Sequence, residues 1–349
     1  MHTPLPHPQR GAATLAIVLI LLGAMLITLL AANRNLLLEL RQSANQVESA
    51  SAFEAAEAGL DWGLAMLNAD AHVGSDCRAS PLATQSFRDR VLDLSAPVVT
   101  PRAVRPACVR EAAGWRCGCP DAGGAVLGVA AEGPSFALRL EPNAAAGTLR
   151  LVAEGCAHFG GECHPEGAGR DGAVAQHQAL IALLPALAVP PAAALTLRPS
   201  GATAENFFAG MFGLSKPAWM GQPAVRRVDC RGDCGEAIAV AVAQGATLIA
   251  LPGDATLRGP LALGTAQRPV LIVAAGALQL QGAVQLTGVA YAASLAWAAP
   301  GATVRGALVS EGSATGDTSL DLQRDPAVLD TLHTRAGSFV RLPGGWRDF

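Results

Sequence analysis

The apolar positions near the N-terminus form two consecutive patterns. Residues 12–32, AATLAIVLILLGAMLITLLAA, carry no charge, and as a helix they span about 31 Å, enough to cross the hydrocarbon core of a bilayer. Apolar residues then recur at helical spacing with no proline up to residue 68, where Asn68, Asp70 and Gly74 supply a polar stop. The spacing predicts one helix of about 85 Å, with its first half in lipid and its second half packed on a folded head.

Beyond the helix the period changes to that of strands. Residues 70–130 are rich in turns, and alternating apolar residues predict strands over 135–140, 148–153 and 174–184. The proline-containing segment 185–191 predicts a linker.

Glycines recur at a regular interval between about residues 235 and 316. The intervals of six residues fall within two groups: Gly276, Gly282 and Gly288, and then Gly306 and Gly312. Apolar residues alternate between them, which predicts short stacked strands in a small β-solenoid. An ordinary glycine-rich sheet is the alternative. We expect a short helix over 326–334, and a tail that caps the last turn of the solenoid.

Composition and charge narrow the functional classes. Apolar residues make up 51% of the 349 positions and charged residues 15%, which argues against a disordered chain. The net charge is −3 and no basic cluster is present, so the sequence lacks the features of a dedicated duplex-binding protein. Arg258, Arg268 and Arg305 are sparse along the solenoid, and we rank contact with DNA below adhesion to a surface.

All eight cysteines follow the apolar segment. An even number fits disulfides in an oxidising compartment, so we expect the part after the helix to be periplasmic or extracellular. Cys156, His158, Cys163 and His164 have the residue types of a zinc site, but the compartment favours a bridge, and we expect no metal and no cofactor. The predicted bridges are Cys156 with Cys163, Cys230 with Cys234, and two in an open order among Cys77, Cys108, Cys117 and Cys119.

The sequence offers no arrangement typical of a catalytic site. Polysaccharide cleavage on a solenoid needs clustered carboxylates, but Glu236, Asp254 and Glu311 lie far apart in sequence. Glu54 and Glu57 on the long helix are interpreted as solvated or subunit-contact groups. We therefore predict a protein without enzymatic activity. Between Cys230 and Cys234 lies an Arg-Gly-Asp triplet, which suggests adhesion, although a stapled turn is the favoured interpretation.

Several stretches resemble PilX-type minor pilins of the type IV pilus. A polar leader ending in Gln9, Arg10 and Gly11 directly before an apolar helix is similar to a prepilin signal. Residues 36–60, LLLELRQSANQVESASAFEAAEAGL, closely resemble the second half of the family's N-terminal domain. The tail at 328–349, VLDTLHTRAGSFVRLPGGWRDF, and the segment FFAGMFGLSKPAW at 207–219 also resemble the family, whereas residues 70–135 carry little of the likeness.

The resemblance implies an α+β fold with a processing site. The resemblance implies a prepilin leader at 1–11, a long N-terminal helix at 12–68 with a transmembrane part at 12–32, and a pilin-like head with a small antiparallel sheet at 69–189. The glycine spacing adds a β-solenoid-like all-β module at 190–349. A prepilin peptidase would cleave between Gly11 and Ala12, and Ala12 would be N-methylated. The other partners would be major and minor pilins and the inner-membrane assembly platform.

The resemblance also implies a function and a location. A minor pilin is held in the inner membrane with its C-terminal part in the periplasm, and is then extracted into the extracellular filament. It would prime filament assembly, with roles in adhesion or twitching motility. Most pilins have Glu where this chain has Ala16, and its absence suggests a position at the tip, because a carboxylate in hydrocarbon implies a partner. A membrane-anchored adhesin or binding module and a pseudopilin of a type II secretion system remain as alternatives.

Overall fold

The computed structural model describes residues 10–94, 99–120, 133–145, 147–158, 172–298 and 301–348. The chain divides into two compact units, Met1–Ser51 and Ala52–Phe349. One helix, α1 (Arg10–Asn68), contributes to both units. The long N-terminal helix predicted from the apolar spacing is therefore confirmed.

The head is built on a six-stranded antiparallel sheet in the order β21-β7-β6-β5-β3-β4. Its core holds apolar side chains from the second half of α1 and from the inner face of the sheet, among them Leu60, Phe136 and Leu151. The strands are β3 (Ala107–Glu111), β4 (Gly114–Gly118), β5 (Ser135–Pro142), β6 (Thr148–Cys156), β7 (Val174–Pro185) and β21 (Gly337–Asp348).

A short irregular segment follows α1 before the sheet begins. It contains the helix α2 (Phe87–Val91) and a two-stranded ribbon of β1 (Leu92–Asp93) and β2 (Thr100–Pro101). Ser86 caps α2, and the carboxylate of Asp89 accepts a hydrogen bond from the backbone N–H of Ser86 in return. Phe87 and Val91 are buried in the head core, so this cap fixes how the segment joins the sheet.

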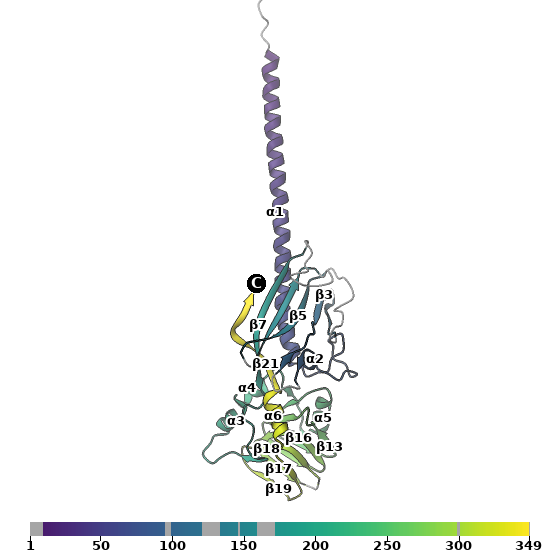
Figure 1. The fold of residues 1–349 in the computed structure, drawn as a ribbon, viewed down its shortest axis with the longest axis vertical. Helices are drawn as coiled ribbons and strands as arrows, with labels where there is room; N and C mark the ends of the chain where they lie inside the picture. The colour runs from purple at the N-terminus through teal and green to yellow at the C-terminus, as the bar shows by residue number, and fades with distance from the viewer. Residues whose placement is uncertain are drawn as a thin grey trace, which may run out of the picture. The chain divides into compact units, whose positions relative to one another are not determined.

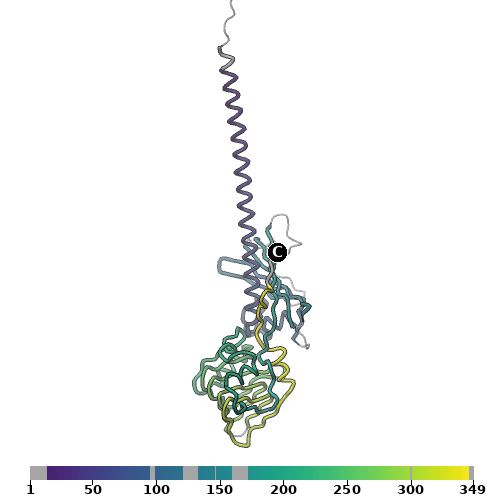
Figure 2. Tube along the Cα trace, turned by 90° about the vertical axis from the view of Figure 1, so that its left-hand side faces the viewer, coloured from purple at the N-terminus to yellow at the C-terminus, as the bar shows by residue number. Residues whose placement is uncertain are grey.

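The C-terminal strand returns to the head, so the expectation that the tail caps the solenoid is wrong. β21 pairs antiparallel with β7, from Gly337 opposite Pro185 to Asp348 opposite His177. In Figures 1 and 2 the yellow C-terminal segment runs beside the teal strands of the head. The reason is that β7 leaves an edge open for pairing, and that Phe339 of β21 is buried in the head core. The solenoid is thus an insertion between two neighbouring strands of one sheet.

The inserted part is a β-solenoid, as predicted, and its strands pair in parallel (Figure 1). One sheet has the order β10-β12-β15-β17-β19; the other has the order β20-β18-β16-β14-β11-β9, with β13 beside β16 and β8 beside β18. The strands are β8 (Leu195–Leu197), β9 (Arg226–Arg227), β10 (Gly232–Asp233), β11 (Leu248–Leu251), β12 (Ala255–Arg258), β13 (Leu261–Leu263), β14 (Val270–Ala274), β15 (Ala277–Gln281), β16 (Val284–Ala292), β17 (Ser294–Ala298), β18 (Thr303–Ser310), β19 (Ala314–Gly316) and β20 (Asp321–Gln323).

The six-residue glycine spacing corresponds to one side of a solenoid turn. Val270 pairs with Gly288, and Gly288 pairs with Gly306, an offset of 18 residues in each case. Gly288 and Gly306 have φ values of +150° and +134°, and they stack where β16 and β18 turn a corner. A Cβ on Gly288 would lie 1.8 Å from the Val270 carbonyl oxygen, so only glycine fits this corner.

Helices cover the solenoid on two sides. α5 (Gly235–Ala243) contributes Ile238 and Ala241 to the core between the sheets. α3 (Ala204–Phe212), α4 (Lys216–Met220) and α6 (Pro326–Thr334) cover the outer face of β11, β14, β16 and β18. Because both faces are buried in β11, β14 and the second halves of β16 and β18, these stretches are continuously apolar. The family-like segment 207–219 supplies the cover: Phe208 and Phe212 pack against Tyr291, and Trp219 packs against Phe208.

Replacing the corner glycine tests the solenoid geometry. We expect Gly288→Ala to lower the free energy of unfolding by roughly 1–3 kcal/mol, because the new Cβ collides with the Val270 carbonyl. Gly253→Ala is the control, since an added Cβ there has no neighbour within 4 Å. Denaturant unfolding of the detergent-solubilised chain, followed by circular dichroism, measures both. Equal stability of the two variants would contradict the corner assignment.

Candidate functional site

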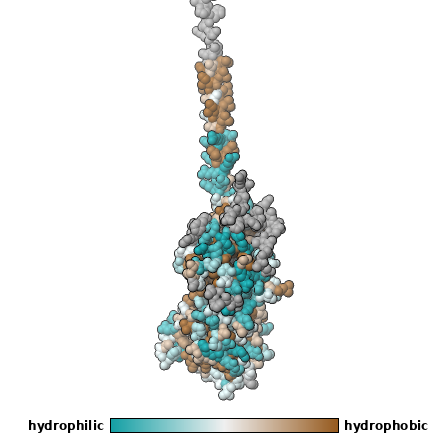
Figure 3. Space-filling view, in the orientation of Figure 1, coloured by the Kyte–Doolittle hydropathy of each residue, from teal (hydrophilic) through white to brown (hydrophobic). Residues whose placement is uncertain are grey.

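The first half of α1 exposes apolar side chains all around its axis. Between residues 15 and 40 the large apolar side chains are 51–70% exposed. Figure 3 shows the outer part of the helix in brown, with teal surface nearer the head. Among the described residues, α1 is the helix whose length and apolar composition would allow it to cross a membrane. Ala16 lies in this run and is exposed. Such a continuous apolar surface requires cover by lipid or by other protein chains.

The second half of α1 packs so closely on the head that its backbone lies against the backbone of β6. Ala52, Ala55, Ala56 and Leu60 are buried, with helical i, i+3 and i+4 spacing. A Cβ on Gly155 of β6 would lie 2.2 Å from the carbonyl oxygen of Ala52. The small residues on both elements therefore let the helix and the strand approach closely. This explains in physical terms why the family-like stretch at 53–60 is rich in alanine and ends in Gly-Leu.

The outward face of the same stretch differs in character. Glu54 and Glu57 are exposed, as expected for solvated or subunit-contact groups. Phe53 is 39% exposed and makes an edge-on contact with His177 of β7, with 4.3 Å between the ring centroids. This side of α1 thus offers both charge and an aromatic surface to a neighbouring molecule.

The last residue of α1 holds the C-terminal strand. The Asn68 side-chain amide donates to the carbonyl oxygen of Phe339 at 2.9 Å, and its oxygen accepts from the Phe339 backbone N–H at 2.8 Å. Both bonds are buried, where an unmade hydrogen bond is costly. Asn68 was expected only to end the helix, and its polarity in sequence gave no sign of a partner 271 residues away.

Arg88 of α2 reinforces the same junction. Its Nε donates to the carbonyl oxygen of Leu67 and its Nη2 to that of Gly337, both at 2.9 Å. The guanidinium also lies 4.9 Å from the centroid of the Phe339 ring. Burial lowers the pKa of Arg88 to about 10, so the side chain stays charged at neutral pH and binds the end of α1 to the start of β21.

Charged residues connect the head to the solenoid. Arg226 of β9 forms a two-point contact with Asp70, with Nη2–Oδ1 at 2.6 Å and Nε–Oδ2 at 3.0 Å. Arg268, which precedes β14, contacts the His72 ring at 2.9 Å and the Asp89 carboxylate at 3.7 Å. Burial, and then the positive charge of Arg268, lower the pKa of His72 below its usual value. Neutral His72 is therefore part of the folded junction.

The disulfides of the described residues lie in the head and beside the solenoid. Cys77 pairs with Cys119, and Cys108 pairs with Cys117 across β3 and β4, which gives the order that the sequence left open. Cys230 pairs with Cys234. Their loop exposes the triplet 231–233, and the Asp233 carboxylate accepts from the Gly235 backbone N–H at 3.0 Å.

Other predicted site residues fall outside the described part of the chain. Cys163 and His164 do so, and the bridge between Cys156 and Cys163 stays a prediction. Gly11 and Ala12 belong to the start of α1, whereas residues 1–9 of the leader are not described. Cleavage between Gly11 and Ala12 likewise stays a prediction. Among the described residues, no group of three or more His, Cys, Asp or Glu side chains could hold a metal ion.

A substitution on β6 tests the close approach of α1 to the head. We expect Gly155→Ala to destabilise the head by roughly 1–3 kcal/mol, because its Cβ would meet the backbone of Ala52 and Ala56. The exposed Gly210→Ala in α3 is the control, and it should be neutral or stabilising by up to about 1 kcal/mol. Unfolding in urea compares them. A Gly155→Ala protein as stable as wild type would show that the helix and the strand lie further apart.

The lowered pKa of His72 predicts a pH dependence of stability. The folded state favours neutral His72, so its contribution is complete above the unfolded pKa of 6.5 and is lost as the pH falls below that value. We expect the melting temperature of the wild type to fall as the pH is lowered from about 7.5 to 5.5, and His72→Gln to reduce that fall. Differential scanning fluorimetry across this range measures it, and parallel pH profiles for the two proteins would contradict the prediction.

The comparisons with known proteins agree with this geometry. Residues 10–61 match the family model described as PilX N-terminal. No curated protein and no solved structure matches the chain. The matched range contains the exposed apolar run of α1 and the alanine-rich stretch that packs on β6. Residues 10–61 are thus similar to a PilX N-terminal domain, which confirms the resemblance of this part of the chain to PilX-type pilins.

Proposed function

We propose that this protein is a minor pilin of a type IV pilus. The observation that carries the proposal is the coincidence of the PilX N-terminal match with the surface of α1. Within residues 10–61 the family match includes both the apolar run at 15–40, which is exposed, and the stretch from Ala52 to Leu60, which the head buries. A subunit that assembles through its N-terminal helix needs one part of that helix free to contact other subunits and another part fixed to its own head.

The apolar half of α1 is suited to burial both in a membrane and in a filament. In the inner membrane, lipid covers residues 12–32, and the head and solenoid lie in the periplasm. In the filament, the helices of neighbouring pilins cover the same side chains. Because burial stabilises at about 25 cal/mol per Å² of apolar surface in either setting, extraction from lipid is offset by packing among helices. Prepilin peptidase, other pilins and the inner-membrane platform are the partners that this route requires.

The N-terminal run and the inserted solenoid support a place at the filament tip. Ala16 stands where most pilins have a glutamate that pairs with the subunit ahead, and a tip subunit has no such neighbour. The solenoid adds a folded module that no neighbour needs to cover, and the 231–233 loop is exposed on it. From this position the protein would prime assembly and contact surfaces, with contact to DNA ranked lower.

The carboxylates of the solenoid favour a structural and not a catalytic role. Asp254 accepts a hydrogen bond from the Ala277 backbone N–H at 2.7 Å, and Glu311 binds both Lys216 and the Tyr291 hydroxyl. These contacts hold turns and the covering helix α4 in place. We therefore infer that the protein acts by assembly and binding, without enzymatic activity.

Processing at Gly11 provides the test. We expect Gly11→Val to block cleavage, because a β-branched side chain shields the scissile backbone. That variant would stay in membranes with its leader and would be missing from sheared filaments. Gly210→Val in α3 is the matched control, since Gly210 is exposed outside the N-terminal helix and an added Cβ there has no neighbour within 4 Å. It should be processed and assembled like wild type, and immunoblots of membrane and sheared fractions measure both.

The outcomes distinguish the alternatives. Wild-type protein with its leader intact and confined to membranes would contradict the proposal and favour a permanently anchored adhesin or binding module. Processed protein that never reaches filaments, in cells that assemble pili, would contradict it in favour of a secretion pseudopilin. Normal assembly of Gly11→Val would contradict the processing site itself.

A further inference from the structure

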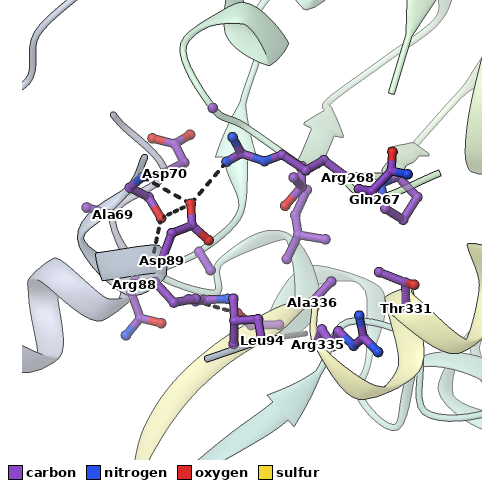
Figure 4. Close-up of a pocket in the computed structure, with 18 residues that line it drawn as sticks. Ala69, Asp70, Arg88, Asp89, Leu94, Gln267, Arg268, Thr331, Arg335 and Ala336 are labelled. Carbon is purple, nitrogen blue, oxygen red and sulfur yellow. Dashed lines mark hydrogen bonds and ion pairs between the residues drawn. The ribbon is translucent and has the colours of Figure 1, made fainter. Parts of the chain in front are cut away.

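A cavity of about 150 Å³ lies where the head, the solenoid and the start of the C-terminal strand meet. The end of α1, α2, the loops before β11 and β14, and the C-terminal end of α6 line it. In Figure 4, Arg268 reaches toward Asp89 and Asp70, and Arg335 lies at the end of α6 beside Thr331. An apolar cavity of about 150 Å³ accepts a benzene-sized molecule, so this space accommodates a phosphate or a small carboxylate.

The charged groups that line the cavity leave an excess of positive charge. They comprise three arginines, Arg88, Arg268 and Arg335, and two aspartates, Asp70 and Asp89. Both carboxylates are engaged: Asp70 by Arg226 at 2.6 Å, and Asp89 by the cap of α2 and by Arg268 at 3.7 Å. Arg88 donates to carbonyl oxygens. Neither of the two carboxylates that line the cavity therefore pairs with Arg335.

Arg335 carries a buried donor that the described part of the chain leaves unsatisfied. It follows the last turn of α6, where its backbone N–H bonds to the Thr331 carbonyl oxygen. Its Nε is buried and makes no hydrogen bond to the described residues. A buried donor without an acceptor destabilises the folded state. A small shift of the Arg335 side chain would bring this donor to an acceptor that enters the cavity from outside the chain.

We propose that the cavity is a binding site for a compact oxyanion, a carboxylate or phosphate group held by Arg335. A guanidinium group has only donors, and its planar fork matches the paired oxygens of these groups. A cation or a neutral apolar ligand would leave the Nε unsatisfied. The oxyanion would lie between Asp89 and Arg268 on one side and α6 on the other, at the contact between the head and the solenoid. The proposal does not depend on the assignment to a pilus.

Thermal unfolding of the full chain in detergent micelles tests the site. Sodium phosphate or sodium acetate replaces sodium chloride at constant pH and ionic strength, so that general screening is the same in all three salts. A ligand that binds the folded state alone raises its stability, and we expect an increase in melting temperature of roughly 2–4 °C. Arg335→Gln should lose this increase, and Arg335→Lys should reduce it, because a lysine lacks the planar fork.

Arg305→Gln is the matched control. Arg305 is exposed on β18, and the same substitution there removes one positive charge without altering the cavity. This variant should keep the wild-type response. A response to phosphate alone supports a phosphate ligand, and a response to acetate alone or to both salts supports a carboxylate-accepting site. The proposal is overturned if neither salt stabilises the wild type more than chloride, or if Arg335→Gln responds like the wild type.

Discussion

The close approach of α1 to β6 is the constraint on which the rest of the structure depends. Gly155 leaves no room for a side chain, so the helix presents Ala52 and Ala56 to the strand and is held by backbone-level contact. This contact uses one stripe of the helix between residues 52 and 67. The apolar side chains between 15 and 40 remain exposed, and their cover has to come from lipid or from other chains. The helix therefore both builds the head and carries an apolar surface that lipid or other chains must cover.

A second constraint is the return of the C-terminal strand. The solenoid leaves the head after β7 and rejoins it at β21, which pairs with β7 in the same sheet. Asn68 and Arg88 bind the backbone of this strand next to the end of α1. Two chain connections and the contact between Asp70 and Arg226 thus fix the solenoid to the head. A module attached in this way is positioned far more closely than one on a single flexible linker.

The sequence was most informative where a pattern is local. The apolar spacing predicted α1, the alternation at 135–184 predicted β5 to β7, and the six-residue glycine interval predicted the solenoid, because each depends on neighbours within a few residues. The resemblance to the family located the alanine-rich stretch, and the structure supplies its reason in Gly155. The position of β21 was not predictable, since its segment carries Pro343 and Gly344 and pairs with a strand more than 150 residues earlier.

The junction residues escaped prediction for a related reason. Asn68, Arg88 and Arg335 have no recognisable spacing, and their roles arise only when α1, α2 and α6 meet. The pairing of Cys77 with Cys119 likewise follows from the path of the segment after α1 and not from the spacing of cysteines. Local sequence patterns thus predict individual helices and strands, whereas contacts between elements far apart in sequence can be identified only from the folded structure.

The most direct measurement is mass spectrometry of the mature N-terminus, on protein isolated from membranes and from sheared surface filaments. A minor pilin that assembles through α1 starts at N-methylated Ala12 and is present in the sheared filaments. A chain that starts at Met1, or that retains Gly11 and is found only in membranes, would contradict the account.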